Sequence, residues 1–290
     1  MCSATAFFQS ISLETTVKGS ARFVRAAAQI PSDALINVAY IGTDSLQERL
    51  QAIDELRAAG LTPRPIVSAR RMPSVEELKA FLQGVVHQRG LRRLFLVGGD
   101  PAMPVGPFEG ASSLIESGVL DGLLLDGICL PGHPEGHPVI PREQLMGHLL
   151  RKVQALEARG FPVDITTQIC VDPVAVVDWI RAVRAQGIQA PIRVGVPSPS
   201  TVDEMLRFYR LCRVETTAGA LARHGWISTV DPNRVDPDHF IGTVSTAMSA
   251  RSDLGRVHLH LFPMMTLPDA LAWFSDTCTR ISSAQVHGDT

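Results

Sequence analysis

Short apolar runs alternate with helical segments along the whole chain, and this alternation is the feature that most restricts its fold. Eight runs have the length and composition of strands: residues 8–16, 35–41, 62–68, 93–97, 122–130, 163–171, 192–196 and 256–262. Helical patterns lie between and after them: residues 20–29, 44–59, 74–89, 141–159, 173–186, 200–212, 217–224, 236–251 and 268–279. This order predicts an α/β fold, a single-domain (βα)8 barrel over residues 1–290, with a frayed end from residue 282.

Capping signals mark several of these helices. Ser45 is followed three residues later by Glu48, and Ser74 by Glu77, which is the spacing of an N-terminal capping box. Pro173 suits the first turn of a helix. A doubly wound sheet is the alternative architecture, but its glycine-rich nucleotide fingerprint does not follow the first predicted strand.

The composition is that of a chain able to bury a large core, with 45% hydrophobic and 19% charged residues. A formal charge of −2 argues against nucleic-acid and membrane-surface partners. No apolar run approaches the roughly 20 residues that a membrane span needs, and the N-terminus lacks the pattern of a signal peptide. The five cysteines form no CxxC pair, which predicts a reduced, cytoplasmic protein.

Residues 131–138 read Pro-Gly-His-Pro-Glu-Gly-His-Pro and follow an apolar strand. The i, i+4 spacing of His133 and His137 would suit a metal only on a helix, and the prolines exclude a helix here. We therefore expect no metal site. Two interpretations stay open for this loop: its histidines cap backbone groups, or the loop contacts a ligand.

Polar residues interrupt the apolar runs where three of the predicted strands end. These residues are Glu14, Asp100 and Gln168. Each has a structural explanation, as a helix cap, a turn former before proline, or a partner for backbone groups. In a barrel, however, the carboxyl ends of the strands meet on one face, where active sites lie. Their common position therefore favours a ligand site.

Two further features suit a ligand with phosphates. Gly98 and Gly99 would expose backbone N–H groups at the end of a strand. Arg151 and Lys152, on the helix that follows the proline-rich loop, could bind a diphosphate or form an ordinary surface pair.

Together these segments resemble the methylenetetrahydrofolate reductase family. Six of them match family motifs in order, over about residues 10 to 200: Ile-Ser-Leu-Glu14-Thr, Leu96-Val-Gly-Gly-Asp-Pro101, the loop 131–138, Leu150-Arg-Lys-Val153, Thr167-Gln-Ile-Cys-Val-Asp172 and Ile192-Arg-Val-Gly-Val-Pro197.

The resemblance implies a flavin-dependent oxidoreductase that reduces 5,10-methylenetetrahydrofolate to 5-methyltetrahydrofolate. It implies non-covalent FAD, with NADH or NADPH as co-substrate. Glu14 would be the general acid and Asp100 a second catalytic residue that tunes charge. Glu14, Asp100, Gln168 and Phe262 would contact the folate. The residues implied for the cofactor are Ala39, Tyr40, Gly98, Gly99, Asp100, His133, Glu135, His137, His148, Arg151 and Lys152.

The chain departs from the family pattern at several of these positions. Gly98 stands in place of an arginine, His133 of a tyrosine, Ile66 of a histidine and Ala39 of a threonine, and the last strand also differs. Four alternatives therefore stay open: direct hydride transfer without flavin, the same chemistry in the oxidative direction, a pterin-binding methyltransferase barrel, and a non-catalytic binding protein. The sequence is compatible with a homo-oligomer.

Overall fold

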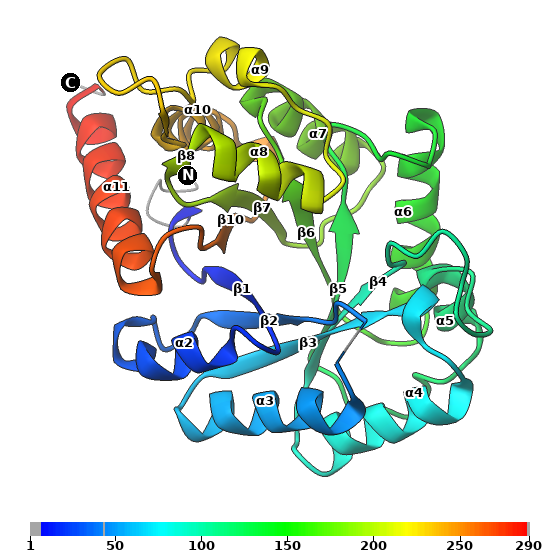
Figure 1. Cartoon of the computed structure of the whole chain (residues 1–290). Helices are drawn as coiled ribbons and strands as arrows, with labels where there is room; N and C mark the ends of the chain where they lie inside the picture. The colour runs from blue at the N-terminus through cyan, green and yellow to red at the C-terminus, as the bar shows by residue number, and fades with distance from the viewer. Residues whose placement is uncertain (1–6, 43, 289–290) are drawn as a thin grey trace. The chain divides into compact units, whose positions relative to one another are not determined.

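The computed structural model describes residues 7–42 and 44–288, and it confirms the predicted (βα)8 barrel (Figure 1). The hydrogen-bonded strand order is that of a closed barrel, β1-β10-β7-β6-β5-β4-β3-β2. The barrel strands are β1 (Ser12–Thr16), β2 (Leu35–Ala39), β3 (Thr62–Ser68), β4 (Arg93–Val97), β5 (Gly127–Gly132), β6 (Val163–Ile169), β7 (Ile192–Pro197) and β10 (Val257–Phe262).

The chain divides into two compact units, which we describe separately. The β2–β5 unit comprises Glu14–Pro131 and Gly147–Ile165, and the β7–β10 unit comprises the described residues as far as Leu13, Gly132–Met146, and those from Thr166 onward. Among the described residues, no helix combines the length and apolar character that crossing a membrane demands.

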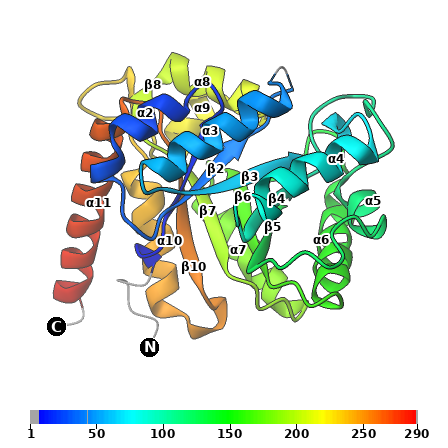
Figure 2. The same ribbon diagram turned by 90° about the horizontal axis from the view of Figure 1, so that it is seen from below.

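In the β2–β5 unit, the parallel register pairs Asn37 with Arg64 and Ile66 with Phe95. Helices α2 and α3 pack side by side, and α3 also packs on β3 (Figure 2). The predicted capping box of Ser45 and Glu48 begins α3. The helices assigned here are α2 (Ser20–Arg25), α3 (Leu46–Ala58), α4 (Val75–Leu82) and α5 (Ala111–Glu116), and α6 (Arg142–Glu157) belongs to this unit from Gly147.

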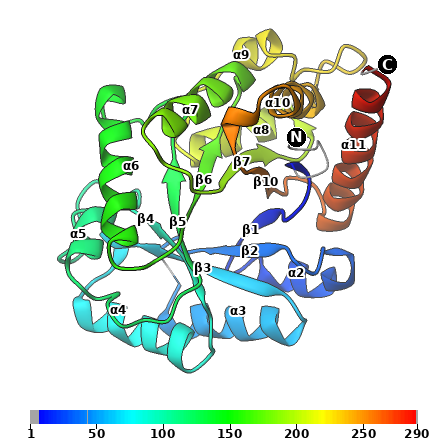
Figure 3. The same ribbon diagram turned by 180° about the vertical axis from the view of Figure 1, so that it is seen from behind.

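In the β7–β10 unit, α10 packs against both α7 and α11 (Figure 3). Asp238 joins α10 to α11, because its carboxylate accepts from Trp273 Nε1 at 3.0 Å and Thr277 Oγ1 at 2.8 Å and pairs with Arg280. The elements besides β7 and β10 are α7 (Pro173–Ala185), β8 (Ser200–Thr201), α8 (Val202–Leu211), α9 (Ala218–Arg223), β9 (Arg234–Val235), α10 (Asp238–Ala250) and α11 (Leu267–Gly288).

The structure corrects several predicted boundaries. The fifth strand begins at Gly127 and not at residue 122, because the chain turns at Gly122 with a φ of 78°. The predicted helix 74–89 leaves the α conformation after Leu82 and continues as a π-helical turn. The expected frayed end is helical as far as Gly288. The short antiparallel pair of β8 and β9 was not predicted.

Asp238 offers a test of how α11 is held. We expect Asp238→Ala to lower the free energy of unfolding by about 1–3 kcal/mol, because two donors and a cation lose their acceptor. Urea denaturation measures the difference. The control is Asp276→Ala at an exposed position of α11, which we expect to change the value by less than about 0.5 kcal/mol. Equal effects of the two substitutions would contradict the role of Asp238.

Candidate functional site

A buried arginine lies in the interior of the β2–β5 unit. Arg64 on β3 is fully inaccessible to solvent. Its Nε donates to Asn37 Oδ1 at 2.7 Å, and its Nη1 pairs with Asp164 Oδ2 at 2.6 Å. Its guanidinium also lies 5.3 Å from the centre of the Phe95 ring. These contacts fix a positive charge inside the barrel sheet.

The predicted acid Glu14 lies within electrostatic range of this charge. Burial by itself would lower the pKa of Arg64, but the Cys129 thiol and the carboxylates of Asp164 and Glu14 hold the pKa above its ordinary value. Glu14 is half-buried near the carboxyl end of β1. Glu14 was among the residues expected from the sequence, whereas Arg64 and Asp164 were not. The sequence did carry a signal for Arg64, which stands between Pro63 and Pro65 in an otherwise apolar strand.

Asp100 is held by an ion pair. Its Oδ1 accepts from Arg71 Nη2 at 2.6 Å and from Arg71 Nε at 3.0 Å, and half of its side chain is exposed. The Arg71 guanidinium occupies the place where a Cβ on Gly42 would be, with Nη1 only 1.7 Å from that point. Arg70 holds the following loop through the carbonyls of Pro101, Ala102 and Glu109.

The paired glycines before Asp100 differ in their surroundings. Gly99 has a φ of 95°, and a Cβ there would approach Ser68 Oγ to 2.1 Å, so this position requires glycine. Gly98 has open space where its Cβ would lie, and its carbonyl accepts from the Arg70 N–H at 2.8 Å. Among the described residues, the buried Ser68 hydroxyl has no hydrogen-bond partner.

The two predicted cofactor residues at the end of β2 are engaged in internal packing. Ala39 packs against an apolar cluster of Ile66, Phe95 and Cys129. The ring of Tyr40 lies 4.0 Å from the guanidinium carbon of Arg49. Burial lowers the pKa of Arg49 to about 10.

Three basic residues lie together on α6. Arg151 Nη2 lies 2.9 Å from His148 Nδ1. Burial lowers the pKa of Lys152 to about 8. Burial, together with the charges of Arg151 and Lys152, lowers the pKa of His148. Arg151 is exposed and Lys152 is half-buried, so both interpretations of this pair, a diphosphate site and an ordinary surface pair, stay open.

In the β7–β10 unit, the proline-rich loop is tied down by its polar side chains. Glu135 Oε1 accepts from the N–H groups of Val171 at 2.8 Å and Asp172 at 2.5 Å, and burial raises the pKa of this carboxyl. His137 Nδ1 accepts from the N–H groups of residues 139 and 140. The His133 and His137 rings meet edge to face at 4.9 Å. Backbone capping, one of the two roles considered for this loop, is thus observed.

Gln168 and Phe262 lie at the carboxyl ends of β6 and β10. Gln168 Oε1 accepts from the next N–H in the chain at 2.9 Å, and its Nε2 donates to the Cys212 carbonyl at 3.3 Å. The ring of Phe262 lies 5.5 Å from that of Phe208 and 4.6 Å from that of His260. The pair of His260 with Ser12 Oγ, at 2.8 Å, was not foreseen.

Four of the residues that the resemblance assigns to flavin make contacts within the protein. Glu135 and His137 are bonded to backbone N–H groups, Ala39 lies in an apolar cluster, and Tyr40 lies against Arg49. The basic residues of α6 suit phosphates, but phosphates are not specific to flavin. The described residues contain no group of three or more His, Cys, Asp or Glu side chains able to hold a metal ion.

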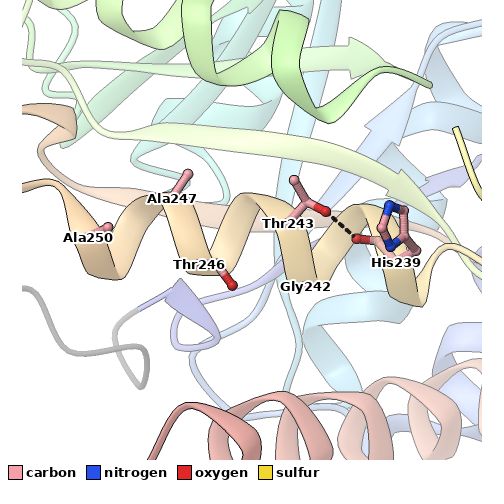
Figure 4. Close-up of a pocket in the computed structure, with 6 residues that line it drawn as sticks. All are labelled: His239, Gly242, Thr243, Thr246, Ala247 and Ala250. Carbon is pink, nitrogen blue, oxygen red and sulfur yellow. Dashed lines mark hydrogen bonds between the residues drawn. The ribbon is translucent and has the colours of Figure 1, made fainter. Parts of the chain in front are cut away.

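A shallow hollow of about 500 Å³ lies elsewhere, along one helix of the β7–β10 unit (Figure 4). It contains none of the predicted site residues. It is lined by His239, Gly242, Thr243, Thr246, Ala247 and Ala250 of α10.

No protein-family model matches this chain. Among solved structures, it is similar to an uncharacterized protein from Clostridium thermocellum that binds two copies of 5-methyl-5,6,7,8-tetrahydrofolic acid. The TM-score is 0.65 at 10% identity, over 97% of each chain. Dihydropteroate synthase from Thermus thermophilus gives a TM-score of 0.48 at 11% identity, over 93% of this chain and 95% of the other. The 3-dehydroquinate dehydratase from Aquifex aeolicus gives 0.43 at 9% identity, over 82% and 98%. At 10% sequence identity, the similarity to the Clostridium thermocellum protein shows the fold alone.

The two adjacent glycines provide a matched pair of substitutions. We expect Gly99→Ala to lower the free energy of unfolding by about 1–3 kcal/mol, because alanine is strained at positive φ and its Cβ meets Ser68 Oγ. Gly98→Ala should change it by less than about 0.5 kcal/mol, because nothing lies near the added Cβ. Urea denaturation of both variants tests this. Equal losses of unfolding free energy in the two variants would show that the positive φ of Gly99 and its contact with Ser68 do not determine which residue this position accepts.

Proposed function

We propose that this chain is an enzyme that binds a reduced folate at the carboxyl ends of its barrel strands. The observation that carries the proposal is its likeness to a barrel that binds 5-methyltetrahydrofolate, which extends over 97% of both chains. Polar groups of suitable chemistry at the strand ends support it. In barrels of this kind, ligand-binding residues come from these ends.

Asp100 has the chemistry that one edge of a pterin requires. The pterin ring presents N–H donors along that edge, and a carboxylate accepts from such donors. Among the described residues, both Arg71 bonds to Asp100 end on Oδ1, and half of this side chain is exposed, so its Oδ2 can accept from a ligand.

The reaction that we propose interconverts 5,10-methylenetetrahydrofolate and 5-methyltetrahydrofolate. In the reductive direction, a proton reaches N10 of the folate and the bond from N10 to the methylene carbon breaks. The resulting iminium carbon accepts a hydride from NADH or NADPH, which leaves as the oxidised nucleotide. Glu14 is the proton donor. We favour direct transfer of the hydride, because Glu135, His137, Ala39 and Tyr40 are engaged in contacts within the protein.

Binding and turnover test this function separately. We expect the purified protein to bind 5-methyltetrahydrofolate in calorimetry, and to oxidise NADH or NADPH only when methylenetetrahydrofolate is present. Glu14→Gln should lower turnover by about 10²- to 10⁴-fold while folate still binds, because the amide cannot donate an acidic proton. Glu116→Gln, at an exposed position, is the control. A protein that binds no folate would refute the proposal, and full turnover of Glu14→Gln would refute the assigned acid.

The visible absorption spectrum decides between direct transfer and a flavin. We expect a colourless protein that retains the folate-dependent oxidation of the nicotinamide. Absorption bands of oxidised flavin that bleach with NADH or NADPH and return with the folate would instead establish the flavin-dependent reductase.

A further inference from the structure

The two consecutive arginines after β3 act in different ways on the loop that follows β4. Arg70 donates to the backbone of that loop. Its acceptors are the carbonyls of Pro101 at 2.8 Å, Ala102 at 2.6 Å and Glu109 at 2.8 Å. The path of the loop is therefore held by bonds in which Arg71 takes no part.

Arg71 donates to a side chain instead. Its Nε and Nη2 both donate to Asp100 Oδ1, at 3.0 and 2.6 Å. Two donors on one rigid guanidinium edge fix the direction in which the carboxylate points. The Arg71 side chain is 21% exposed and that of Asp100 51%, and ion pairs so close to solvent add little to the stability of a fold. The main consequence of this pair is therefore the orientation of Asp100.

A third loop makes room for the Arg71 guanidinium. A Cβ on Gly42 would lie 1.7 Å from Arg71 Nη1 and 2.8 Å from its Cζ, so any larger residue there would displace the guanidinium. Gly42 follows β2, Arg71 follows β3 and Asp100 follows β4. One guanidinium thus joins three loops at the carboxyl ends of neighbouring strands.

We propose that Arg71 is a positioning residue that aims the Asp100 carboxylate at a ligand, in the space that Gly42 leaves for it. This inference rests on the proposed function, in which Asp100 accepts from the N–H donors of a pterin. The two bonds from Arg71 engage both lone pairs of Oδ1, and Oδ2 is the oxygen presented to the ligand. Because a carboxylate offers acceptors alone, the site selects a ring edge that carries N–H donors and disfavours one that carries acceptors.

The affinity of the full chain for 5-methyltetrahydrofolate, measured by calorimetry, tests this role. We expect Arg71→Met to weaken binding about ten- to hundredfold, because a misaimed carboxylate loses its charge-assisted hydrogen bond to the ligand. Gly42→Ala keeps both partners of the ion pair but displaces the guanidinium, so it should weaken binding to a similar extent. In the Arg71→Met background, Gly42→Ala should change the affinity by less than about twofold, since the two substitutions remove the same interaction.

Two controls separate positioning from loss of structure. Gly60 has a φ of 79° and nothing within 4 Å of its added Cβ, so Gly60→Ala strains the backbone without displacing a group and should bind folate like the parent. Arg70→Met should lower the midpoint of urea denaturation, whereas Arg71→Met should keep the midpoint of the parent. A midpoint that falls as far in Arg71→Met as in Arg70→Met would make the role of Arg71 structural.

A measurement without folate tests the arrangement itself. In protein labelled with ¹⁵N at arginine, we expect the Arg71 Nε–H to be protected from exchange with water, and Arg71→Lys identifies its NMR signal. Gly42→Ala and Asp100→Ala should remove this protection, and Gly60→Ala should retain it.

Two results would overturn the inference: a protected Nε–H in Gly42→Ala, or parental folate affinity in Arg71→Met. Where Gly42→Ala does not fold, Arg71→Met and Asp100→Ala still decide. A parent protein that binds no folate would refute the proposed function, and with it the ligand assigned to Asp100, whatever the NMR measurement shows of the ion pair.

Discussion

The burial of Arg64 is the constraint on which the interior of the β2–β5 unit depends. Removing an ion from water costs several kcal/mol, and only well-placed partners offset that cost. Asp164 and Asn37 supply the acceptors, and Phe95 presents its ring to the guanidinium. Each partner comes from a different strand. A change in strand register would leave the Arg64 charge buried without its partners. The ion pair therefore stabilises the observed register, and the unpaired charge would destabilise other registers.

Three other carboxylates near the ends of strands differ in how many hydrogen bonds they accept. Glu135 accepts two backbone N–H groups and fixes the proline-rich loop. Asp100 is paired through one oxygen and remains half exposed. Glu14 is half-buried, and its charge contributes to raising the pKa of Arg64. Of these three, Glu135 is held by two backbone bonds, whereas half of the Asp100 side chain stays exposed.

The barrel could be predicted from the sequence because hydrophobic alternation and helix caps are local signals. The strands Thr62–Ser68 and Arg93–Val97 have the predicted bounds, and the capping box of Ser45 forms as expected. The fifth strand was placed too early because an apolar run continues through the turn at Gly122. The polar residues at the strand ends could also be found, but their partners could not. The pairing of Asp100 with Arg71 depends on the packing of two loops against each other. A pattern in the sequence of either loop does not contain that information.

The half-buried Lys152 on α6 has a thermodynamic consequence. Burial lowers its pKa to about 8, so a substantial fraction of the amine is neutral in mildly alkaline solution. An anion bound against it would favour the charged form and raise that pKa. Binding would then take up a proton from the solvent, and affinity would increase as pH falls through about 8. The heat of such binding would vary with the ionisation enthalpy of the buffer. Calorimetry in several buffers would therefore reveal an anion that binds at Lys152 of α6.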